Sequence, residues 1–213
     1  MTGIYKSTFY NVIFIIKFLC NWNVEPLLKF ESQLNHKIEL MITIIVGTNR
    51  KDSVSQHVAN QYSETLQDMG MENKILNLRE LPTDFIYSAL YENVGKNEQF
   101  NQIRIWMNQS EKFVFVIPEY NGSFPGVLKA FLDGLDRAAF EDKKCALVGI
   151  SAGDQGAGLA LSHFTDILNY CGTNVLAYRL RIAKIGDVMS DNKISDQLYI
   201  SKIRKQADKL IKF

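Results

Sequence analysis

The stretch KFVFVIPEYNGSFPGVLKAFLDGLDR, residues 112–137, joins an apolar run to a helical pattern through a stiff turn. Residues 113–117 have the unbroken apolar character of a strand that is buried on both faces. A strand-to-helix turn usually needs two to six residues, but this one contains Pro118, Gly122, Pro125 and Gly126. Proline fixes the backbone and glycine permits unusual torsions. We therefore predict a loop of one fixed shape, which can present N–H and C=O groups to a flat or charged ligand.

From residue 41 onward the chain alternates strand and helix signals. Strands are predicted at 41–46, 73–78, 113–117, 145–150 and 174–180, and helices at 54–69, 98–109, 126–138, 158–171 and 195–211. Apolar strands separated by helices indicate a parallel sheet that is covered on both faces. We predict an α/β fold, a flavodoxin-like three-layer sandwich with a five-stranded parallel sheet in the order 2-1-3-4-5. Ligands bind such sheets at the carboxyl ends of the strands, so the loops after strands one, three and four should carry the function.

Composition excludes several classes of protein. A length of 213 residues fits one domain with a substantial core. The formal net charge of +1 shows no excess of basic residues of the kind that nucleic-acid-binding proteins carry. It also argues against an acidic electron carrier. The three cysteines lack the spacing of a metal site, and they indicate free thiols in a reducing compartment, hence a cytoplasmic protein.

Residues 1–40 differ from the remainder of the chain. Their apolar run, 9–22, is interrupted by Asn11, Lys17 and Asn21, and is too short and too polar for a membrane span. No small-residue cleavage site of a signal peptide follows it. We predict a flavodoxin-like domain over 41–213 that begins at Met41, preceded by an upstream extension or a mis-set start. A real amphipathic anchor or an extra helix is the alternative.

The loop after the first strand, GTNRKDSVSQHVA at 47–59, has the composition of a phosphate site. Thr48, Ser53 and Ser55 offer hydroxyls, Arg50 offers a fork of donors, and a helix begins near Ser53. A helix start presents unpaired N–H groups and favours an anion. The loop lacks both GxxxxGK[ST] and GxGxxG, so a terminal phosphate monoester fits better than a triphosphate or a dinucleotide. The alternative is that Ser53 is only an N-cap and Arg50 only a surface charge.

Two motifs together resemble the NADPH-dependent FMN reductase family. They are GTxRxxS at 47–53 and PEYNGSxPGxLK at 118–129, of which the second is the specific one. That family includes quinone, chromate and azo-dye reductases with a flavodoxin-like fold. The resemblance runs from about Met41 to the C-terminus and leaves residues 1–40 outside.

The resemblance implies FMN as the cofactor and NADPH or NADH as the co-substrate. It assigns the FMN phosphate to Thr48, Arg50, Ser53, Ser55 and Gln56, and the isoalloxazine to Pro118, Glu119, Tyr120, Asn121 and Gly122. The loop GISAGDQGAG, residues 149–158, would meet the other side of the ring through Ser151 and Gly153. Its glycine spacing is not that of a dinucleotide fingerprint.

The implied activity is an oxidoreductase in which a hydride passes from NAD(P)H to bound FMN and then to a quinone, azo, metal or similar small-molecule acceptor. No catalytic side chain and no metal are expected, because the flavin carries the chemistry. The resemblance also implies a homodimer or homotetramer. Two other functions remain open: an FMN-binding electron carrier, and a flavin-binding sensor that does not oxidise a nicotinamide. Steady-state oxidation of NADPH would separate them from the reductase.

Overall fold

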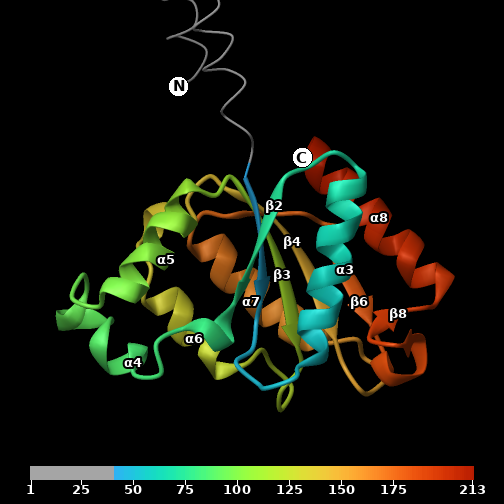
Figure 1. Ribbon diagram of the computed structural model, residues 1–213, viewed down its shortest axis with the longest axis horizontal. Coiled ribbons are helices and arrows are strands. Elements are labelled where there is room, and N and C mark those ends of the chain that lie inside the picture. The colour runs from blue at the N-terminus through green and yellow to red at the C-terminus, as the bar shows by residue number, and fades with distance from the viewer. Residues whose placement is uncertain (1–40) are drawn as a thin grey trace, which may run out of the picture. The chain divides into compact units, whose positions relative to one another are not determined.

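The computed structural model describes residues 41–213 (Figure 1). The predicted extension at 1–40 therefore lies outside the described residues. Among helices of the described part, none combines the length and the apolar character that crossing a bilayer requires.

The centre of the fold is a parallel sheet in the order β2-β1-β3-β4-β5, with a further short strand, β6, also paired to β4. The four long strands are β1 (Ile42–Val46), β2 (Asn73–Asn77), β3 (Lys112–Pro118) and β4 (Lys144–Ile150). The predicted α/β class and strand order are confirmed. The register places Val46 beside Val116 and Pro118 beside Ile150, so β1, β3 and β4 end at one edge of the sheet.

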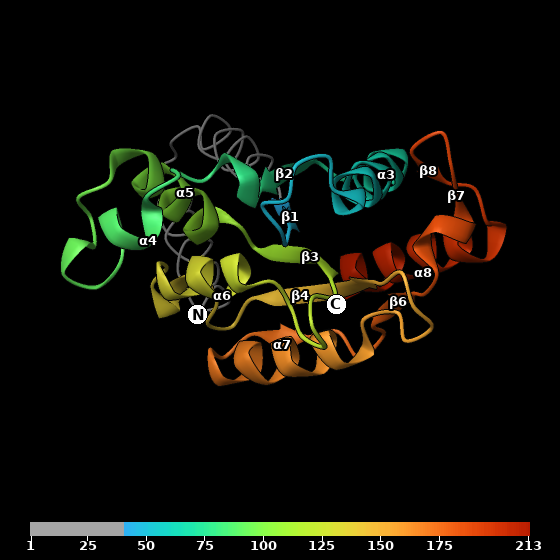
Figure 2. The same cartoon turned by 90° about the horizontal axis from the view of Figure 1, so that it is seen from below.

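Helices cover both faces of this sheet, which makes the predicted three layers (Figure 2). One face carries α3 (Val54–Asp68) and α8 (Gln197–Lys212), and the other carries α5 (Glu98–Gln109), α6 (Gly126–Asp133) and α7 (Gly158–Tyr170). The side chains of β3 alternate between the two layers. Val114 and Val116 pack toward α3 and α8, whereas Phe113, Phe115 and Ile117 pack toward the other face.

The prediction of one continuous fifth strand over 174–180 is wrong. The chain forms β5 (Asn174–Val175) and β6 (Leu180–Ile182), which pair with opposite ends of β4. Between them the Leu176 N–H still donates to Cys145 O of β4 at 2.8 Å, and residues 177–179 leave the sheet. The buried side chain of Gln206 fills the gap, because its Nε2 donates to the carbonyl oxygens of Leu147 (3.0 Å) and Tyr178 (2.7 Å). A side chain from α8 thus replaces a hydrogen bond that a continuous strand would have supplied.

Two other boundaries differ from the prediction by more than one residue. Helix α6 ends at Asp133, before the buried Gly134, and 137–139 form a separate short turn of helix. Helix α8 begins two residues later than predicted, because Asp196 Oδ1 accepts from the N–H groups of Leu198 and Tyr199. The remaining elements, absent from the prediction, are α4 (Phe85–Ser88), the hairpin of β7 (Met189–Ser190) and β8 (Lys193–Ile194), and the 3-10 turns Leu78–Glu80, Tyr91–Asn93 and Ile185–Val188.

The Gln206 bridge gives a stability prediction. Gln206→Met keeps the size of the side chain but leaves the carbonyl of Leu147, in a buried bond, and that of Tyr178, in a partly buried one, without their donor. It also removes the unpartnered Oε1 of Gln206, so we expect the free energy of unfolding to fall by about 1 kcal/mol. Urea unfolding would measure it. The control is Gln197→Met at the exposed start of α8, which should change stability by less than about 0.5 kcal/mol. Equal effects of the two substitutions would show that the bridge does not stabilise the fold.

Candidate functional site

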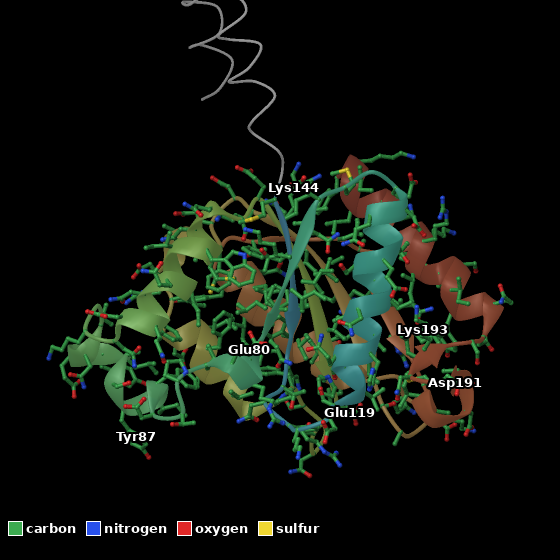
Figure 3. The ribbon with its side chains drawn as sticks, viewed as in Figure 1. Glu80, Tyr87, Glu119, Lys144, Asp191 and Lys193 are labelled. Carbon is green, nitrogen blue, oxygen red and sulfur yellow. The ribbon has the colours of Figure 1, made fainter. Side chains whose placement is uncertain are left out.

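A pocket of about 250 Å³ opens where β1, β3 and β4 end. Its walls come from three loops and one more distant segment: Arg50, Asp52, Ser53, Val54 and Ser55; Pro118, Glu119 and Tyr120; Ile150, Ser151 and Ala152; and Ile185. Figure 3 shows Glu119 at this end of the sheet and Lys144, the first residue of β4, at the opposite end. The loops predicted to carry the function therefore meet in one place.

Seven of the twelve predicted site residues line this pocket, namely Arg50, Ser53, Ser55, Pro118, Glu119, Tyr120 and Ser151. The other five, Thr48, Gln56, Asn121, Gly122 and Gly153, belong to the same loops or to the first turns of α3 but do not form its wall.

The start of α3 is open to a ligand. Ser53 occupies the N-cap position with an extended backbone, yet its side chain makes no capping hydrogen bond. Ser55 is 2% exposed, and within residues 41–213 neither serine hydroxyl has a hydrogen-bond partner. The first turn contains no acidic side chain. Free N–H groups and hydroxyls at a helix start form an anion site, and Arg50 adds a positive charge at its rim.

The loop after β3 has the fixed shape that its sequence predicts. Asn121 and Gly122 have φ values of 51° and 75°, and Tyr120 and Ser123 exchange two backbone hydrogen bonds of 2.8 and 3.1 Å. These torsions define a type I′ turn, for which Asn-Gly is the favoured pair. The N–H of Glu119 donates to Ile150 O at 2.9 Å, which extends the pairing of β3 with β4 by one residue.

Thr48 and Tyr120 join the first loop to the third. Thr48 is fully buried, its Oγ1 lies 2.9 Å from Tyr120 Oη, and it accepts from the N–H of Arg50 at 3.2 Å. Thr48 therefore holds Arg50 and Tyr120 in place and does not itself line the pocket.

Gln56 is turned toward strand β2. Its Oε1 accepts from Asn77 Nδ2 at 2.6 Å, and its Nε2 donates to Asn60 Oδ1 at 2.7 Å. The oxygen of the amide thus fastens α3 to the end of β2, and its nitrogen bonds one turn along α3.

The loop after β4 is organised by Ser151. Its Oγ donates to Gly153 O at 2.8 Å and accepts from the N–H of Gly156 at 2.9 Å. A Cβ on Gly149 would lie 2.7 Å from Gly156 O, so only glycine fits there, whereas a Cβ on the exposed Gly153 would meet nothing within 4 Å. Gly153 is thus free of packing constraints and open to a ligand.

Glu119 has an unsatisfied acceptor beside the pocket. Among the described residues, its Oε2 is buried and has no hydrogen-bond partner. Such an atom is costly in a folded protein. A donor on a bound ligand could lower that cost by drawing the carboxylate toward the pocket, because the side chain already forms part of its wall.

Sequence reasoning missed five residues of the wall: Asp52, Val54, Ile150, Ala152 and Ile185. The first four adjoin predicted site residues and could have been found by extending each loop by one position. Ile185 lies 34 residues after Ser151, and the hydrogen bond from its N–H to Ser151 O (3.1 Å) brings it to the pocket. No local pattern in the sequence signals that contact.

Neither described cysteine is placed as a nucleophile. Burial raises the pKa of the Cys145 thiol, which has no exposed surface. Burial also raises the pKa of Cys171, which lies at the far end of α7 from the pocket. Because the thiolate is the reactive form, both groups stay inert near neutral pH.

The Thr48–Tyr120 contact can be tested by a double-mutant cycle. Thr48→Val and Tyr120→Phe each remove one hydroxyl of the pair. Because the two hydroxyls contact each other, we expect the double variant to be more stable than additivity predicts, by about 0.5–1.5 kcal/mol. Urea unfolding of the four proteins gives the coupling energy. Strict additivity would mean that the two loops are not joined through this contact.

Comparison with known proteins agrees with this geometry. The family model for NADPH-dependent FMN reductase matches residues 40–184. A quinone reductase of Pseudomonas putida is 32% identical over 126 residues, which cover 57% of this chain and 65% of that protein. An NADPH azoreductase of Bacillus sp. (strain OY1-2) is 28% identical over 127 residues, or 58% of this chain and 65% of that protein. The chain thus spans just under two thirds of the length of these curated relatives.

Solved structures show the same fold. The flavoenzyme NAD(P)H:(acceptor) oxidoreductase of Paracoccus denitrificans superposes with a TM-score of 0.70 at 20% identity, over 81% of this chain and 95% of that one. An oxidoreductase of Corynebacterium diphtheriae gives a TM-score of 0.66 at 19% identity, over 81% and 94% of the two chains. The match of the family model to more than half of the sequence establishes that this chain belongs to the NADPH-dependent FMN reductase family.

Proposed function

We propose that this protein is an NAD(P)H-dependent oxidoreductase that binds FMN in the pocket at the ends of β1, β3 and β4 and reduces a small-molecule acceptor. Membership of the family supports the cofactor and the donor. Relatives named quinone reductase and NADPH azoreductase support quinones and azo compounds as acceptor classes.

The observation that carries the proposal is the uncapped start of α3 beside a rigid, partly apolar wall. The phosphate of FMN would be held by the N–H groups of the first helical turn, the hydroxyls of Ser53 and Ser55, and Arg50. Thr48 contributes indirectly, by fixing the loop that carries Arg50. Ile150 and Ile185 would give the ring an apolar surface.

The polar edge of the ring would meet main-chain donors from two loops. The N–H groups of Glu119 and Tyr120 are already used, by Ile150 O and Ser123 O. Those of Asn121, Gly122, Ala152 and Gly153 have no partner within residues 41–213, so they are the available donors. This supports a role for Asn121, Gly122 and Gly153 through the backbone, although none of these three lines the pocket.

Bound FMN would supply the redox chemistry, accepting two electrons as a hydride from NAD(P)H and delivering them to the acceptor. The protein has to bind the flavin, orient it and favour the negative charge that reduction places on its pyrimidine edge. Fixed N–H donors serve that purpose because they need no rearrangement when the charge develops. We propose that the unpartnered Oε2 of Glu119 accepts a hydrogen bond from a donor on the ligand.

The direct experiment is the visible spectrum of the FMN-loaded protein, recorded without oxygen before and after adding NADPH or NADH. Loss of the flavin bands with either nucleotide, followed by reoxidation with a quinone, is the expected result. Bands that neither nucleotide bleaches would contradict the reductase and favour an electron carrier or a sensor. Protein that takes up no FMN would contradict the cofactor assignment itself.

The residues proposed to bind the FMN phosphate give a sharper prediction. Arg50→Gln should weaken FMN binding about tenfold or more, because it removes a charged hydrogen-bond donor. Riboflavin lacks the phosphate, so its affinity should not change. Fluorescence titration of both flavins measures the two effects. The matched control is Arg204→Gln on the exposed face of α8, which should alter neither affinity. An equal loss for FMN and riboflavin would place Arg50 away from the phosphate.

We further propose a cytoplasmic homodimer or homotetramer. The segment after β2 supports self-association, because it exposes four apolar side chains: Ile86 (46%), Tyr87 (82%), Tyr91 (73%) and Val94 (47%). Figure 3 shows Tyr87 projecting outward from this segment. Light scattering would give the mass in solution.

The proposed compartment rests on the cysteines. The two thiols in the described part, Cys145 and Cys171, are unpaired, which suits a reducing compartment.

A further inference from the structure

Helix α7 contacts the turn of the loop after β3 through a polar side chain, His163. Its Nδ1 lies 3.0 Å from Ser123 Oγ, 40 residues earlier in the chain. Ser123 is the last residue of the type I′ turn, and its N–H and C=O are the two groups that pair with Tyr120. The side chain of His163 therefore holds one end of the turn. Figure 2 shows the loop between β3 and α6 reaching α7.

The other end of the turn is held by a different element. Tyr120 Oη lies 2.9 Å from Thr48 Oγ1, in the loop after β1. Asn121 and Gly122 lie between these two fixed points, and their N–H groups have no partner within residues 41–213. The two side-chain contacts thus fix the position of two free donors, which are those that the proposed function assigns to the flavin ring.

The Ser123–His163 hydrogen bond is not needed to attach the loop to the helix. The rings of Phe124 and Phe164 already pack edge to face, with their centroids 5.2 Å apart, and Phe164 is fully buried. His163 itself is exposed, and substitutions at such positions usually change stability little. What the hydrogen bond adds is direction, because it depends strongly on angle whereas apolar packing does not.

We propose that His163 is a positioning residue for the flavin, which acts through Ser123 to orient the N–H groups of Asn121 and Gly122 toward the pyrimidine edge of the ring. The inference rests on the proposed function, because it assumes that FMN binds with this edge at the turn.

The same geometry should set the redox balance of the bound flavin. Donors that are held in place favour the negative charge of the reduced ring, because they need not rearrange when the charge develops. Hydrogen bonds to a charged acceptor are about twice as strong as those to a neutral one. A looser turn should therefore weaken the binding of reduced flavin more than that of oxidised flavin, and so lower the midpoint potential.

The test compares Ser123→Ala and His163→Leu with the wild type, each as the full-length protein. Each substitution removes one partner of an exposed hydrogen bond and should leave the fold intact, as circular dichroism would verify. We expect the affinities for oxidised FMN and for riboflavin to fall by the same factor, about two- to tenfold for one hydrogen bond. The reason is that the two flavins share the ring. Fluorescence titration measures both affinities.

The midpoint potential of the bound FMN is the readout that a merely structural role would not change. In each variant it should fall by about 14 mV or more. For a two-electron couple this corresponds to an affinity loss that is about threefold greater for the reduced flavin than for the oxidised one. Reduction by dithionite beside a reference dye measures the potential without any nicotinamide, so the result does not depend on turnover.

Three further variants separate the hydrogen bond from other effects. His163→Asn can place an amide where Nδ1 lies and should restore most of the affinity and the potential. The double variant Ser123→Ala, His163→Leu should lose no more than either single one, because both remove the same bond. Ser162→Ala removes a neighbouring hydroxyl that donates to Gly158 O within α7, and it should change no value.

Three outcomes would overturn the inference. Unchanged affinities and potential in both variants would show that the contact does not position the flavin. A loss for FMN but not for riboflavin would place the effect at the phosphate. Lower affinities with an unchanged potential would leave His163 with a structural role alone. Wild-type protein that binds neither flavin would contradict the proposed cofactor as well, so the two failures are distinguishable.

Discussion

The structure depends on the parallel pairing of β3 with both β1 and β4. Residues 113–117 of β3 have no exposed surface, and every position from Lys112 to Pro118 is paired with β4. This alignment brings the loops after three strands to the same edge of the sheet. One further hydrogen bond, from Glu119 N–H to Ile150 O, continues the pairing of β3 with β4 by one residue into the loop after β3. The geometry of the site is therefore an extension of the geometry of the sheet.

Much of the fold could be predicted because the decisive signals are local. The strands β1, β3 and β4 are short apolar runs, and turn residues bound them. The Asn-Gly pair in the loop after β3 specifies its own turn, since both positions need a positive φ. The alternation of strands and helices then indicates a doubly wound parallel sheet, for which 2-1-3-4-5 is one of the two common orders.

The remaining features depend on contacts between distant residues. The break between β5 and β6 is bridged by Gln206, which lies 59 residues after Leu147, and the apolar letters at 174–180 give no sign of it. Gln56 and Thr48 were predicted to contact the phosphate from their positions in a motif. Their side chains hold β2 and Tyr120, and their contact with the phosphate stays a prediction. A motif indicates which residues belong to a site, but only the packing shows which of them face the ligand and which position their neighbours.

The central claim is that FMN lies with its phosphate at the start of α3 and its ring against the loops after β3 and β4. The most direct measurement is a crystal structure of the protein with FMN. We expect the phosphate within hydrogen-bond distance of the Ser53 and Ser55 hydroxyls, with the ring beside Pro118–Tyr120 and Ala152. Flavin bound elsewhere, or with its ring at α3 and its phosphate in solvent, would contradict the account.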